Sequence, residues 1–158
     1  MDWHTDMSLR ETFTDGLKAS MRAGDAARTS TLRMILARLK DMDIAARPKG
    51  VTAIPDDEVL AMLRGMVKSR RESVALYQQG NRPELAAKEE AEITVIEGFL
   101  PQQMSDADLA AAVDAAVQST GAAAPKDMGR VMAALKAAHG AALDMGRAGP
   151  LVRARLSP

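Results

Sequence analysis

The chain of 158 residues contains no cysteine, so it can form no disulfide and carries no thiolate chemistry. Aromatic residues are also scarce, at 3% of the sequence: Trp3, Phe13, Tyr77 and Phe99. A hydrophobic core must therefore be aliphatic, and eleven methionines are available to fill irregular gaps between helices. Methionines also suit an adaptable binding surface, although core packing is the interpretation that we favour.

An excess of one charge is lacking as well, because 21 basic residues balance 21 acidic ones. This balance excludes a strongly basic nucleic-acid binder as a description of the whole chain, but it leaves a local basic patch open. No apolar run approaches the ~20 residues that span a bilayer, and the acidic start is unlike a signal peptide. We therefore expect a cytoplasmic protein without a membrane segment. Met7 resembles a second start, so residues 1–7 are expected to be a flexible extension.

The spacing of apolar residues predicts an all-α fold, since no stretch alternates as a strand does. A first helix is expected to bury residues that recur every four positions: Leu9, Phe13, Leu17 and Met21. Three more helices are predicted over about 26–46, 56–79 and 83–99, and Asn81 reads as the N-cap of a capping box with Glu84. Short polar connections predict that these four helices form an antiparallel bundle.

Gly98, Pro101 and Ser105 mark the best candidate for a domain boundary. We predict an N-terminal helical domain over residues 8–100 and a small three-helix domain over residues 105–156. Ser105 should cap the fifth helix, and an Ala/Gly-rich linker at 120–125 should precede the sixth.

Groups for catalysis are few. Only two histidines are present, His4 and His139, and neither a phosphate-binding glycine loop nor a catalytic triad is visible. We interpret His139 as a helix cap or a nucleic-acid contact. Carboxylates at 89, 90, 92 and 97 read as a solvated helix face, and Arg70 and Arg71 as surface ion-pair partners. No catalytic residue, metal or cofactor is therefore predicted.

The C-terminal part of the chain is locally basic. Residues 126–158 hold six basic and two acidic side chains, and Gly146 offers a place where backbone could approach a phosphate. Phosphate contacts supply most sequence-independent affinity for nucleic acids. The candidate nucleic-acid contacts are Lys126, Arg130, Lys136, Arg147 and Arg153, of which we rank Arg130, Lys136 and Arg147 first. An ordinary solvated face explains the same residues equally well.

Several stretches are similar to the GatB/YqeY family. They are LRMILARLK at 32–40, RRES at 70–73, YQQGNR at 77–82, AKEEAEI at 87–93, FLP at 99–101 and MGRVM at 128–132. Phe99 is a departure, because we expect Tyr before Leu-Pro. The resemblance covers essentially residues 7–156.

This resemblance implies a tRNA-associated accessory role in translation. In the GatB subunit of the glutamine-dependent amidotransferase, a related tail follows a separate catalytic core and contacts tRNA during amidation. The chain is similar to that tail alone, so the family's carbon–nitrogen ligase activity need not reside in these residues. We expect weak tRNA binding, and a translation-related protein is a further expected partner. The alternative is a protein-docking adaptor that uses Met-rich grooves, and an exposed apolar patch of Met128, Met132 and Met145 would favour it.

Overall fold

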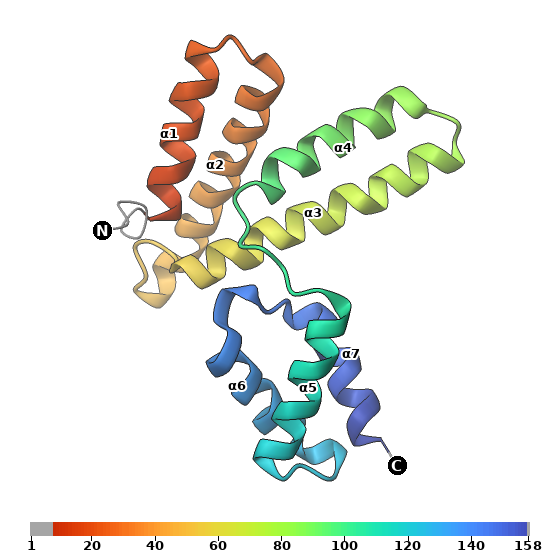
Figure 1. The fold of residues 1–158 in the computed structure, drawn as a ribbon. Coiled ribbons are helices and arrows are strands. Elements are labelled where there is room, and N and C mark those ends of the chain that lie inside the picture. The colour runs from red at the N-terminus through yellow and green to blue at the C-terminus, as the bar shows by residue number, and fades with distance from the viewer. Residues whose placement is uncertain (1–7, 158) are drawn as a thin grey trace. The chain divides into compact units, whose positions relative to one another are not determined.

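The computed structural model describes residues 8–157, which form seven α-helices and three short 3₁₀ turns (Figure 1). The prediction of an all-α fold is confirmed. The expected extension at residues 1–7 lies outside the described residues. The chain separates into two compact units, one that ends at Leu100 and one that begins at Pro101. We call them the first and the second unit.

The first unit consists of two helical hairpins (Figure 1). Helix α1 (Leu9–Arg22) pairs with α2 (Ala26–Ala46), and α3 (Asp56–Gln79) pairs with α4 (Pro83–Glu97). Local capping explains where the first hairpin begins and turns. Ser8 accepts a hydrogen bond from the N–H of Glu11 in a capping box, and the Asp25 carboxylate accepts from the N–H of Arg28.

An aliphatic core with one aromatic pair joins the helices of the first unit. Its fully buried side chains include Phe13, Leu32, Ile35, Leu63 and Ile96. Phe13 meets Phe99 edge-to-face at 5.1 Å between ring centroids, a favourable geometry for two aromatic quadrupoles. The expectation that Met21 faces inward is wrong, because its side chain is 55% exposed. Met21 lies in the last turn of α1, beyond the residues with which α1 packs on the core.

The prediction of Asn81 as a helix N-cap is also wrong. Asn81 has a φ of 56° and ends α3, where the N–H of Arg82 bonds the carbonyl of Tyr77 at 2.8 Å and the N–H of Asn81 bonds that of Gln78 at 3.2 Å. This is the Schellman arrangement, in which asparagine tolerates the left-handed conformation better than most residues do. Helix α4 instead begins after Arg82, with no side-chain cap.

An ion pair holds the first hairpin to the loop that precedes α3. The Arg10 guanidinium donates to both oxygens of Asp43, at 2.7 and 2.8 Å, and to the carbonyl of Ile54 at 3.0 Å. Asp43 also accepts from the N–H of Ile54 at 2.9 Å. The hydrogen bond from Arg10, aided by the one from Ile54, holds the pKa of Asp43 below its ordinary value against the opposing effect of burial.

The second unit is a three-helix bundle of α5 (Asp106–Thr120), α6 (Met128–His139) and α7 (Met145–Leu156). Ser105 caps α5 as predicted, accepting from the N–H of Asp108 at 3.1 Å. Small and branched side chains fill its core, among them Leu109, Val113, Val131, Leu135 and Val152. Of the three methionines whose exposure would favour the adaptor alternative, Met128 and Met132 are half-buried against this core and Met145 is exposed.

Candidate nucleic-acid interface

The five predicted nucleic-acid contacts all lie in the second unit but on three of its elements. Lys126 lies in the 3₁₀ turn η2 (Pro125–Asp127), Arg130 and Lys136 lie on α6, and Arg147 and Arg153 lie on α7. Arg147 is half-buried and the other four are exposed. Arg130 and Lys136 are six residues apart, which turns their side chains about 120° from each other around the helix. They therefore do not share one face of α6.

Arg130 belongs to a cluster that closes the loop between α5 and α6. Its guanidinium donates to Asp127 at 2.8 Å and to the carbonyl of Thr120 at 3.1 Å. Asp127 also accepts from the N–H groups of Ala123 and Ala124, at 3.0 and 3.2 Å. These bonds, with that from Ala123 the strongest contributor and Arg130 next, lower the pKa of Asp127 to about 2. The Arg130 guanidinium is thus already engaged in an ion pair and a hydrogen bond within the second unit.

Arg147 has a similar structural role at the start of the second unit. Its guanidinium donates to the carbonyl of Met104 at 2.9 Å and to Asp106 at 2.7 Å, so α7 is fastened to the segment that leads into α5. The N–H of Gly146 bonds the Asp144 carboxylate at 2.9 Å. The capping carboxylate therefore occupies this N–H, which is not free to donate to a phosphate.

Carboxylates of α5 offset most of the local basic charge. Arg155 pairs with Asp114, just as Arg147 pairs with Asp106. From residue 101 onward the chain holds six basic and five acidic side chains, a net charge of plus one. The side chains of Lys126, Lys136 and Arg153 form no ion pair or hydrogen bond in the described part of the chain. These three are the cations that the second unit leaves available.

In the first unit, Arg70 and Arg71 form ion pairs as predicted, but across helices. Arg70 bonds Glu92 of α4 at 3.0 Å, with the two side chains only 15% and 16% exposed, and Arg71 pairs with Glu97. The interpretation of Glu92 as part of a solvated face and of Arg70 as a surface residue is wrong. The cause is the close packing of α3 against α4, which brings the two side chains together between the helices.

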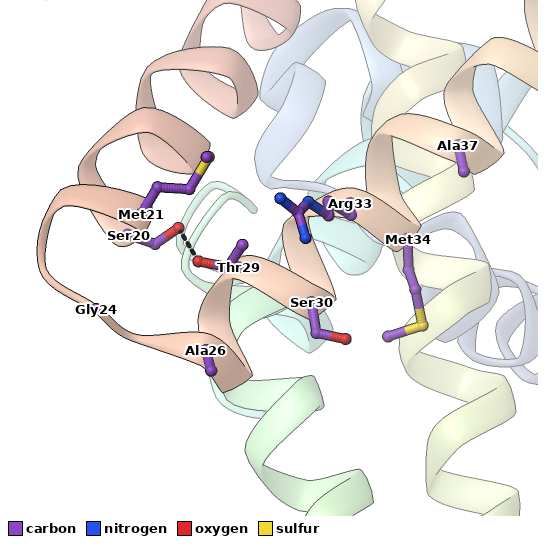
Figure 2. Close-up of a pocket in the computed structure, with 9 residues that line it drawn as sticks. All are labelled: Ser20, Met21, Gly24, Ala26, Thr29, Ser30, Arg33, Met34 and Ala37. Atoms are coloured by element: carbon purple, nitrogen blue, oxygen red, sulfur yellow. Dashed lines mark hydrogen bonds between the residues drawn. The ribbon is translucent and has the colours of Figure 1, made fainter.

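The α1–α2 hairpin and the 3₁₀ turn η1 (Arg47–Lys49) that follows it together carry a net basic charge. Residues 8–50 hold nine basic and five acidic side chains, a net charge of plus four. Figure 2 shows a groove of about 570 Å³ on this hairpin, with Met21 on α1 and Arg33 and Met34 on α2 among the side chains that line it. The four-residue repeat of apolar side chains predicts Met21 as a core residue, so the sequence alone does not indicate this surface.

Metal and membrane sites are not found in the described residues. Between residues 8 and 157 no three histidine or acidic side chains are close enough together to hold a metal ion. No helix in that range is long and apolar enough to cross a bilayer.

Comparison with known proteins identifies the family. Residues 10–156 match the YqeY-like protein family, which is nearly the whole chain. The chain belongs to the YqeY-like family. The predicted resemblance to this family is thereby confirmed.

Relatives of this YqeY-like chain occur in fungi. An uncharacterized protein of Schizosaccharomyces pombe is 31% identical over 98 residues, which are 62% of this chain and 73% of that protein. Proteins named altered inheritance of mitochondria protein 41, mitochondrial, are 30% identical in Vanderwaltozyma polyspora over 84 residues and in Lachancea thermotolerans over 86. These matches cover 53% and 54% of this chain and 44% of each of the two mitochondrial relatives. The chain therefore spans less than half of their length.

Proposed function

We propose that this YqeY-like chain is an accessory module that binds tRNA weakly through its second unit and does not itself catalyse a reaction. The observation that carries the proposal is the set of three unpaired cations, Lys126, Lys136 and Arg153, on the unit that resembles the tRNA-contacting tail of GatB. A cation without an internal partner can neutralise a phosphate without first breaking an ion pair.

The ion pairs change the ranking of the five candidate residues. Arg130 and Arg147 are already engaged in ion pairs with Asp127 and Asp106. Their replacement would disturb structure and binding at once, whereas Lys126, Lys136 and Arg153 can be replaced without loss of an internal bond. Three phosphate contacts give a slope of log affinity against log salt of roughly −2 to −3.

Titration of fluorescent tRNA at several salt concentrations tests the proposal. We expect the triple variant Lys126→Ala, Lys136→Ala and Arg153→Ala to bind more weakly and to lose most of that slope. The matched control removes the same charge from the first unit, by replacement of Lys49, Lys68 and Lys88 with Ala. Far-UV circular dichroism checks that both variants fold.

Two outcomes would contradict the proposal. Equal losses in the two triple variants would mean that affinity follows total charge, not a surface of the second unit. Formation of Gln-tRNA from Glu-tRNA, glutamine and ATP by the isolated chain, abolished by a point substitution, would contradict the non-catalytic role.

The cytoplasmic location also stays a prediction, to be checked by imaging of the tagged protein.

A further inference from the structure

The groove on the first hairpin lies across the exposed face of α2. Ala26, Ser30, Arg33 and Ala37 follow one another at intervals of four, three and four residues, so they share one side of the helix. That row extends over roughly 16 Å, or three helical turns. The small side chains of Ala26, Ser30 and Ala37 are all exposed, and packed helices approach to the short end of their usual 8–10 Å axis separation where the contact residues are small.

Both edges of the groove are fixed by bonds within the protein. At the α1 side, the hydroxyls of Ser20 and Thr29 hydrogen-bond at 2.8 Å and are buried between the helices (Figure 2). At the other side, the sulfur of Met34 accepts a hydrogen bond from Arg70 at 3.7 Å, and Arg70 is itself held by Glu92. The groove is therefore a formed surface that a partner need not induce.

The lining combines apolar groups with one positive charge. Met21 is 55% exposed although it is a large apolar side chain. In Figure 2 the Arg33 side chain lies between Met21 and Met34. Arg33 is exposed and pairs with none of the carboxylates in the described part of the chain, and no acidic residue lies among the described residues that line the groove. An occupant that fits this surface is apolar on one side and carries a carboxylate opposite Arg33.

We propose that this groove docks an amphipathic, acidic helix of a protein partner. Its apolar stripe would cover Met21 and Met34, where the flexible thioether of the exposed Met21 adapts to varied side chains, and an Asp or Glu would pair with Arg33. The net charge of plus four over residues 8–50 attracts such a helix at longer range. RNA fits less well, because the lining offers a single cation and no aromatic ring on which a base could stack. The proposal does not depend on the tRNA surface, which lies in the second unit.

A designed peptide serves as the probe. It has 16 residues, with Leu at positions spaced 4, 3 and 4 apart, Glu beside them and a fluorescent label. A second peptide of the same pattern carries Lys in place of Glu. We expect the full chain to bind the acidic peptide. Arg33→Glu should weaken that binding at least tenfold and improve binding of the Lys peptide. Met21→Ser should weaken binding of both peptides several-fold. Lys68→Glu, with the same charge change on α3, is the control and should leave binding within twofold.

Methionine methyl NMR locates the contact. The peptide should shift the methyl signals of Met21 and Met34 and leave those of Met128 and Met132 unchanged. If Lys68→Glu weakens binding as much as Arg33→Glu does, or if Met21 and Met34 do not shift, the proposal is wrong. If Arg33→Glu lowers tRNA affinity while neither peptide binds, the groove is an RNA surface and the proposal is overturned.

Discussion

Replacement of Asp43 should destabilise the first unit through one identifiable cluster. Asp43 accepts two hydrogen bonds from Arg10 and one from the N–H of Ile54, and its side chain is 18% exposed. Hydrogen bonds to a charged group contribute about 1.5–3 kcal/mol each when buried. Arg10 is 30% exposed and keeps its bond to the Ile54 carbonyl, so water can replace part of what is lost. We therefore expect Asp43→Ala to cost about 2–3 kcal/mol and Asp43→Asn about 1–2 kcal/mol.

The same cluster predicts how stability depends on pH. The pKa of Asp43 is lowered in the folded protein, chiefly by its hydrogen bond from Arg10, relative to an ordinary value of 3.8. A lowered pKa means that the stabilisation is complete above the pKa of the unfolded chain and is lost as the pH falls through the folded value. The difference in unfolding free energy between wild type and Asp43→Asn should be constant from about pH 6 to 8 and shrink below about pH 4.

Urea unfolding followed by circular dichroism measures these effects, and exchange of the Ile54 amide reports the cluster directly. Asp41→Ala is the control, because the Asp41 side chain is exposed on the same helix and forms no hydrogen bond or ion pair with a described residue. Its effect on the free energy of unfolding should stay within about 0.5 kcal/mol. A double-mutant cycle with Arg10→Ala should give a coupling of about 1–2 kcal/mol. If Asp43→Ala costs no more than Asp41→Ala, or if the coupling is absent, the argument from this cluster is refuted.

Two further predictions concern bonds between helices. Ser20→Ala leaves the buried hydroxyl of Thr29 without its partner and should lower the free energy of unfolding in urea by about 1–2 kcal/mol. Addition of Thr29→Val should recover part of that loss, and no recovery would contradict the hydrogen bond as the cause. Arg147→Met removes the link between α7 and Asp106 and should speed exchange of the Asp108 and Leu109 amides, which bond Ser105 at the start of α5. Replacement of the exposed Arg153 by Met should not, and equal exchange in the two variants would refute the structural role of Arg147.

Helices could be predicted from the sequence because their signals are local. The repeat of apolar residues predicted α2 and α3, and the glycines and prolines that interrupt it predicted their limits. Ser105 marked the start of α5 because an N-cap bonds an N–H only three residues away. Local rules also produced the errors. Asn81 fitted an N-cap by spacing alone, yet it ends the preceding helix, and only the backbone conformation distinguishes these two roles.

The candidate site depended on which helices pack together. The sequence determined that residues 126–158 are basic, and the tertiary structure decided which of those charges stay free. Asp106 and Asp114 each lie 41 residues from the arginine they neutralise, so no helical repeat could reveal the pairing. Burial of Glu92 against Arg70 and exposure of Met21 have the same physical reason. Sequence spacing determines on which side of its own helix a residue lies, whereas the packing of the other helices determines which residues contact that side.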